Sequence, residues 1–314
     1  MATDYYPKSS PMRVQARQGS EVERVYFAGS ALPQVWPMPK AIAPGISPSV
    51  MDDLIYHGGK VVPQMEFQNI YLGGEDAWKA SDIASIDSAI ELAMTDRRLN
   101  NVMVRYFPGT KMTCDMRASF IVDEARPKRL DEPDVQAMVT SLYDSAQIKK
   151  KDLDSTLFNL ILPSGTTLHL GNSSSTAGLG GYHGSLHLNR GGKKVTLYYS
   201  ANVYSEMQDN DSENGIVAFN RPWKNVVGTL YHEINEFRTD PDVNDAIEQN
   251  SNEFLGWNSR RGHEVGDQPI FVASSLSQVF KEVRDATGKR RIPVQFMYSN
   301  AVHGPEGPIS RPHI

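Results

Sequence analysis

Residues 226–237 read Val-Val-Gly-Thr-Leu-Tyr-His-Glu-Ile-Asn-Glu-Phe, and they predict the central helix of the fold. The apolar residues of this stretch recur at spacings near 3.6, as on an amphipathic helix that packs one face against a core. His232 and Glu236 are four residues apart, so on a helix they lie one turn apart on the same face and can chelate one ion. The run Thr239-Asp-Pro241 is expected to end the helix, because proline cannot continue it.

The same stretch carries the pattern of a hydrolytic metal site, His232-Glu-x-x-Glu236. In zinc hydrolases with His-Glu-x-x-His on a helix, the first glutamate is the general base for a metal-activated water. We therefore expect His232 and Glu236 to be ligands and Glu233 to be the base. Zn²⁺ is the expected ion, although carboxylate ligands also suit other divalent metals. The alternative is a helix whose exposed face simply carries His and Glu.

A second polar cluster follows in the run Gly262-His-Glu-Val-Gly-Asp267. Zinc hydrolases often take two ligands from a helix and a third from a later segment, and they leave one position open for water. This cluster offers Glu264, Asp267 and His263 as the third ligand, and the sequence leaves the choice among them open. The alternative here is a polar turn formed around the two glycines.

His183 is the remaining candidate for a catalytic role. It follows a segment rich in Gly, Ser and Thr and lies at the start of an expected strand. From there its imidazole can donate a hydrogen bond to a developing oxyanion or to a substrate carbonyl. A histidine with a structural role in a loop or on a strand is the alternative.

Segments of the chain, in order, resemble the phosphate-induced protein 1 family, which includes the plant exordium proteins. The segments that carry the resemblance are Tyr182-His-Gly-Ser185, His232-Glu-x-x-Glu236, Thr239-Asp-Pro241, Gly256-Trp257 and Glu264-x-Gly-Asp267. The resemblance covers roughly residues 66–270. It implies a zincin-like active-site helix beside a mixed sheet, although exordium proteins are better known for growth and cell-wall signalling than for peptidase activity.

The cysteine content departs from that family. Its members carry one cysteine just before the Tyr-His-Gly segment and another after the Glu-x-Gly-Asp turn, where this chain has Gly180 or Gly181 and Gln268. The single cysteine, Cys114, allows no intrachain disulfide, which fits a reducing compartment. Since no signal-peptide pattern is present, we expect a cytoplasmic protein. The family resemblance implies secretion as the alternative.

Composition limits the partners. The net charge of −5 gives no basic excess of the kind that binds nucleic acid or an anionic membrane surface. No apolar run approaches the roughly 20 residues that a membrane-spanning helix needs. We therefore expect neither nucleic acid nor membrane as a partner, and peptide or amide substrates are the first choice.

The rest of the chain mixes predicted strands and helices, which indicates an α/β (α+β) fold. Residues 1–62 are rich in Pro, Gly and Ser and are expected to form an extended arm, while 63–314 form a single metal-binding domain. We expect a zincin-like mixed sheet with flanking helices. Its strands are expected at 69–72, 102–107, 156–162 and 194–200, its helices at 81–99 and after Asp131, and a flexible loop at 171–184.

Two functions follow from these expectations. The first is a zinc-dependent hydrolase, a metallopeptidase or amidase with Glu233 as general base. The second is a non-catalytic, exordium-like module whose metal site is structural and which acts through protein or cell-wall interaction. They differ in one property of the site, because a catalytic site keeps a position open toward a cleft and a structural site is closed.

Overall fold

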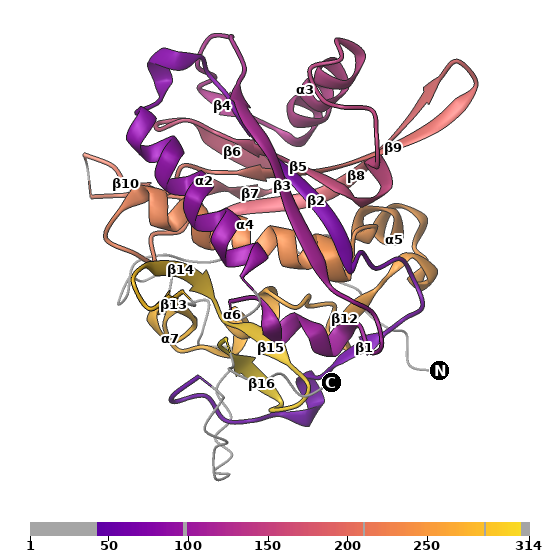
Figure 1. The fold of residues 1–314 in the computed structure, drawn as a ribbon, viewed down its shortest axis with the longest axis vertical. Helices are drawn as coiled ribbons and strands as arrows, with labels where there is room; N and C mark the ends of the chain where they lie inside the picture. Colours follow the sequence, from indigo (N-terminus) through magenta and orange to yellow (C-terminus); the bar gives the residue numbers. More distant parts are fainter. Residues whose placement is uncertain (1–42, 97–98, 210, 286, 309–314) are drawn as a thin grey trace.

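The computed structural model describes residues 43–96, 99–209, 211–285 and 287–308, and its centre is a five-stranded mixed sheet (Figure 1). The strands lie in the order β3-β2-β5-β9-β8. Their bounds are β2 (Gln64–Tyr71), β3 (Thr113–Ile121), β5 (Thr156–Ile161), β8 (Gly181–Arg190) and β9 (Lys193–Asn202). The first four in this order run parallel, and β8 closes one edge antiparallel to β9. The predicted mixed α/β fold is thus confirmed.

Helices cover both faces of this sheet. The central strand β5 is buried along its whole length, as expected for a strand between two layers. Leu157 and Ile161 of β5 pack on the side of α2 (Ala80–Thr95) and α4 (Pro222–Thr239), whereas Phe158 and Leu160 pack on the side of α3 (Glu132–Asp144). The helices expected at 81–99 and after Asp131 are therefore present.

The helix α4 is the element that the sequence predicts best. Its apolar stripe, from Val226 to Phe237, is fully buried. Pro222 occupies the first turn, and the helix ends at Thr239, just before Asp240 and Pro241, as expected. The polar face of α4 is buried as well, because the C-terminal part of the chain covers it.

That C-terminal part consists of short helices and hairpins packed below the sheet in Figure 1. The hairpin β13–β14 contacts α4 and α2 through β14. The elements of this part are α5 (Val243–Gln249), β12 (Trp257–Ser259), α6 (Asp267–Val272), α7 (Leu276–Val279), β13 (Phe280–Arg284), β14 (Arg291–Gln295), β15 (Met297–Ser299) and β16 (Gly304–Glu306). The other short strands are β1 (Leu54–Tyr56), β4 (Arg129–Leu130), β6 (Thr167–Leu170), β7 (Ser173–Ser174), β10 (Glu206–Met207) and β11 (Glu213–Asn214).

Two predictions about local structure are wrong. Residues 102–106 lie in the 3-10 helix η3 (Asn101–Tyr106) and Phe107 follows it, and the strand beside β2 is β3, which comes later in the chain. Tertiary contacts override the strand preference here, since the Tyr106 hydroxyl donates a hydrogen bond to the Tyr298 carbonyl at 2.8 Å. The expected loop at 171–184 contains β7 and a 3-10 turn, and its last residues open β8. Three of its glycines, Gly180, Gly181 and Gly184, are closely approached by other atoms, and a Cβ at Gly181 would lie 2.8 Å from a backbone oxygen.

The predicted arm is only partly described. Most of residues 1–62 lies outside the described residues, but β1 pairs antiparallel with β12. This part of the arm therefore packs on the body of the protein.

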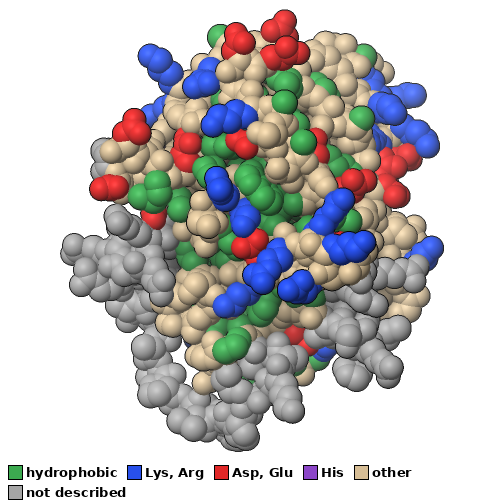
Figure 2. All heavy atoms as spheres, turned by 60° about the vertical axis from the view of Figure 1, so that its left-hand side comes forward, with side chains coloured by type: hydrophobic (Ala, Val, Ile, Leu, Met, Phe, Trp, Pro, Cys, Tyr) green, Lys and Arg blue, Asp and Glu red, His purple; other side chains and the backbone are tan. Residues whose placement is uncertain are grey.

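Among the described residues, no helix is both long and apolar enough to cross a membrane. Figure 2 shows basic and acidic side chains interspersed on one face of the molecule.

Candidate metal centre

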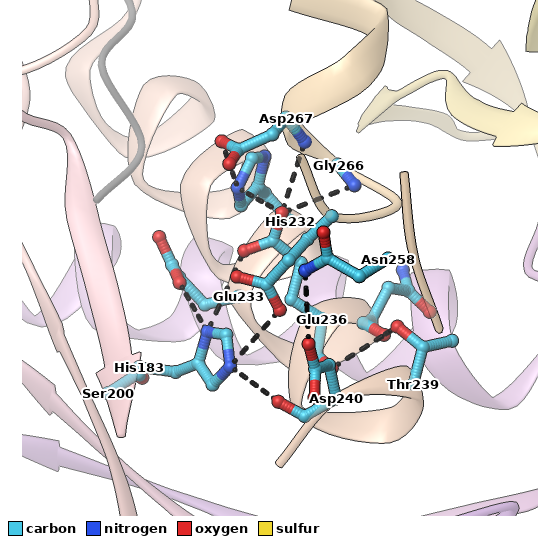
Figure 3. Close-up of polar contacts among 12 residues, drawn as sticks. His183, Ser200, His232, Glu233, Glu236, Thr239, Asp240, Asn258, Gly266 and Asp267 are labelled. Atoms are coloured by element: carbon cyan, nitrogen blue, oxygen red, sulfur yellow. Dashed lines mark hydrogen bonds and ion pairs between the residues drawn. The ribbon is translucent and has the colours of Figure 1, made fainter. Parts of the chain in front are cut away.

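Apart from His263, the predicted site residues come together where the polar face of α4 meets β8 and the turn before α6 (Figure 3). Each is at most 5% exposed. These residues are His183, His232, Glu233, Glu236, Glu264 and Asp267. His263 lies apart from them, because its ring stacks on Phe271 and its Nδ1 lies 2.6 Å from the Gln268 side-chain oxygen.

The potential ligands form two groups that share Glu236. In the first, His232, Glu236 and Asp267 each present an atom within 4.8 Å of the others, and we call it the inner group. His183, Glu236 and Glu264 satisfy the same criterion, and we call them the outer group. Two of the candidates for the third ligand therefore belong to different groups: Asp267 lies beside His232, and Glu264 lies beside His183.

A glutamine from β14 sets the orientation of the His232 ring. Its amide nitrogen donates to the Gly266 carbonyl at 2.5 Å, so the Gln295 side-chain oxygen faces His232 Nδ1 at 2.9 Å and accepts from it. Nδ1 therefore carries the proton, and Nε2 points toward Glu236 Oε1 at 2.9 Å. Metal-binding histidines are usually held in this way by an acceptor on the second nitrogen. Sequence reasoning missed Gln295, which follows His232 by 63 positions and shares no motif with it.

Replacing Gln295 is expected to weaken the metal site without breaking the fold. In Gln295→Leu the His232 ring loses the acceptor on Nδ1, and metal affinity should fall about 10- to 100-fold. Competition with a chromophoric chelator measures this directly. Gln249→Leu, at an exposed position at the end of α5, is the matched control and should bind as the wild type does. Equal affinities of the two variants would contradict the role given to Gln295.

The turn before α6 approaches the helix closely at a glycine. The backbone N–H groups of Gly266 and Asp267 donate to Glu236 Oε1, at 3.2 and 3.1 Å. A Cβ on Gly266 would lie 2.6 Å from His232 Nδ1 and 2.9 Å from Glu236 Oε1. The glycine in Glu264-x-Gly-Asp267 is therefore required by contact with both ligands rather than by its backbone conformation.

Gly266→Ala should damage the site through this contact. The added methyl group has to displace His232 or Glu236, and overpacking of this kind costs about 1–3 kcal/mol. We expect a lower thermal unfolding midpoint together with weaker metal binding, measured by calorimetry with and without added Zn²⁺. A variant with unchanged stability and unchanged metal affinity would show that the turn can move away at no cost.

A third set of contacts joins the end of α4 to the segment around Trp257. The Asp240 carboxylate accepts hydrogen bonds from the Gly256 amide at 2.8 Å and from the Asn258 side chain at 3.2 Å. The backbone oxygen of Asp240 accepts from His183 Nε2 at 3.1 Å. Thr239-Asp-Pro241 and Gly256-Trp257, noted separately in the sequence, therefore meet behind the site.

The buried carboxylates of the cluster lie close together, and their charges affect one another's pKa values. Burial raises the pKa values of Glu264 and Asp267 well above their usual range, and neighbouring carboxylates, Glu236 first, raise them further. Burial alone would lower the pKa of His232, but the charge of Glu236 and a hydrogen bond to it raise that pKa to about 10. Among the described residues, no Lys or Arg forms an ion pair with these carboxylates.

Buried atoms without hydrogen-bond partners point into the same space. They are Glu233 Oε1, Glu264 Oε1 and Asp267 Oδ2. Unpaired buried polar atoms are costly, so several in one place would be stabilised by a bound cation. Imidazole nitrogens and carboxylate oxygens are donors that suit Zn²⁺ and other divalent ions.

A cavity of about 230 Å³ reaches the cluster from one side. His183 and Glu264 of the outer group line it, together with Val243, Asn244 and Ile247 from the α5 segment. His232 and Asp267 are not among its lining residues. His183 and Glu264 thus meet the cavity, whereas the residues of the inner group do not line it.

The fold and this cluster define the class of protein: an α/β protein with buried His and carboxylate groups suited to a divalent cation. Comparison with protein-family models, with curated proteins and with solved structures found no match. What the protein does must therefore be inferred from the residues of the site.

Proposed function

We propose that the protein is a metal-dependent hydrolase, with Zn²⁺ as the first choice of metal and peptides or amides as substrates. The observation that carries this proposal is the set of buried, unpaired oxygens on Glu233, Glu264 and Asp267 next to His183 and His232, with His183 and Glu264 lining a cavity. A site that only stabilised the fold would not need to meet a cavity.

Each residue has a separate role in this proposal. His232 and Glu236 hold the cation, with Asp267 as third ligand. A divalent cation held there polarises a substrate carbonyl and lowers the pKa of water. Glu233 is the general base, since its Oε1 has no hydrogen-bond partner and is able to take a proton from water. His183 lines the cavity and lies 3.3 Å from Glu233 Oε2 through Nδ1, so it is placed to orient Glu233 or to meet a developing oxyanion.

The arrangement of helix and sheet supports the zincin-like part of the proposal. The helix α4 packs against the mixed sheet and contacts the antiparallel edge strand β8, which carries His183. The exordium-like resemblance implies a helix in this place, and we keep both the zincin-like fold and the family as part of the proposal.

One observation favours the second function, a structural metal in a non-catalytic module. The inner group is at most 1% exposed, and its histidine and aspartate do not line the cavity. A closed site of this kind is typical of structural metals. Catalysis therefore depends on whether the cavity gives water and substrate access to the cation.

The test is metal analysis of the purified protein combined with a hydrolysis assay. We expect stoichiometric zinc or another divalent metal, and cleavage of members of a fluorogenic peptide and amide panel. A chelator should abolish that cleavage, and added Zn²⁺ should restore it. Wild-type protein without metal would rule out both functions, whereas metal without any cleavage would favour the structural one.

A further inference from the structure

The geometry points to two cation positions rather than one. We propose that the outer group binds a second divalent cation and that the Glu236 carboxylate bridges it to the cation of the inner group. This inference rests on the proposed function, because it takes the inner group as the first position.

The two oxygens of Glu236 face different histidines. Oε1 lies 2.9 Å from His232 Nε2, and Oε2 lies 3.6 Å from His183 Nδ1. Figure 3 shows Glu236 between the two rings. A carboxylate shared by two ions has both oxygens used in this way.

Both histidines are oriented in the same manner. His232 donates from Nδ1 to the Gln295 side-chain oxygen, which directs Nε2 toward Glu236. His183 donates from Nε2 to the Asp240 backbone oxygen, with Glu264 Oε1 3.6 Å from the same nitrogen, and its Nδ1 faces Glu236 and Glu233. Each ring therefore has one nitrogen fixed by an oxygen acceptor and the other turned into the cluster, as in metal-bound histidines. The inference assigns His183 to the outer cation rather than to an oxyanion.

Each group also has an unpaired oxygen of its own. Glu264 is 1% exposed and its Oε1 has no hydrogen-bond partner, and the same holds for Asp267 Oδ2 in the inner group. A single cation in the inner group would leave Glu264 Oε1 of the outer group without a partner. With both positions filled, Glu264 and Asp267 each coordinate a cation.

The charges of the cluster point the same way. The cluster contains four carboxylates and two imidazoles. Among the described residues, no Lys or Arg forms an ion pair with these carboxylates. Buried charges are stable only when they are paired, and a second divalent cation offsets the excess that the first leaves. Of the cluster, only His183 and Glu264 line the cavity, so the outer cation is the one that a substrate meets. In two-metal hydrolases, the pair of ions stabilises both the attacking and the leaving oxygen.

Metal counting tests this inference. Wild-type protein saturated with Zn²⁺ and then desalted should hold two equivalents per chain by mass spectrometry of the metal. Glu264→Gln removes a ligand of the outer group only and should hold one equivalent. Glu253→Gln, at an exposed position, is the matched control and should hold two.

The outcomes separate this inference from the proposed function. No metal in the wild type overturns both. One equivalent in the wild type leaves the proposed function standing and overturns the second position. Two equivalents retained by Glu264→Gln also overturn it. A crystal of the Zn²⁺-loaded protein gives a count without any variant, because anomalous scattering should show two peaks, roughly 3.5–4 Å apart, on either side of Glu236.

Discussion

Glu233→Gln is expected to lower hydrolysis by about 10²- to 10⁴-fold while the protein keeps its metal. Glutamine has the shape of glutamate but cannot take a proton from water, so the chemical step loses its base. The metal ligands His232, Glu236 and Asp267 are unchanged in this variant. The side-chain amide that replaces the carboxylate has the same size and can keep its place beside His183, whose Nδ1 lies 3.3 Å from Glu233 Oε2 in the wild type.

The measurement pairs the turnover number on the best substrate of the panel with metal analysis of the same sample. Asp267→Asn serves as the contrasting variant, because it changes a ligand and should lose metal as well as activity. Glu253→Gln is the neutral control at an exposed position. Full turnover by Glu233→Gln would remove Glu233 from the mechanism. Loss of metal equal to that of Asp267→Asn would make it a ligand instead of a base.

The parts of the site that the sequence predicts are those that depend on short-range spacing. The face of α4 that carries His232, Glu233 and Glu236 follows from the helical period alone, and the helix ends where Thr239-Asp-Pro241 places it. The contribution of Glu264 and Asp267 follows from a second local motif. All of these residues are buried in one cluster, as the metal-site hypothesis requires.

The parts that could not be predicted depend on contacts between distant segments. Gln295 reaches His232 only because the β13–β14 hairpin packs against α4. The division of Glu264 and Asp267 between two groups depends on the path of one turn through space, which no spacing in the sequence encodes. The same limit explains why the choice of third ligand stayed open.

The error at 102–107 has a different cause. Two valines, a tyrosine and a phenylalanine in six residues favour a strand by propensity. The buried residues Val102, Met103, Tyr106 and Phe107 form two adjacent pairs separated by two partly exposed residues, which is not the alternation of a half-buried strand. In so short a segment the two patterns are hard to separate, and packing against the C-terminal hairpins decides between them.

Removing the metal is expected to make the protein less stable, and increasingly so as the pH rises. Without a cation, burial raises the pKa of Asp240 from 3.8 to about 7, and the charge of Glu236 outweighs burial to raise that of His232 from 6.5 to about 10. Groups with raised pKa values bind more protons in the folded than in the unfolded state, so their contribution to stability is lost as pH rises through the folded pKa. The contribution of Asp240 to stability should be lost between about pH 4 and 7, and that of His232 between about pH 6.5 and 10.

The bound metal should reverse this trend, because a cation takes the place of protons on the ligands and binds them best when they are deprotonated. A ligand that binds only the folded state stabilises it by about 4 kcal/mol when its free concentration is 1,000 times its Kd. Thermal unfolding of chelated and Zn²⁺-loaded protein between pH 5 and pH 9 should therefore show two curves that diverge as the pH rises. His232→Ala, which lacks an inner ligand, should respond less to chelator at every pH. Parallel curves, or a chelated protein that grows more stable toward pH 9, would mean that the buried carboxylates and His232 do not form a cation site.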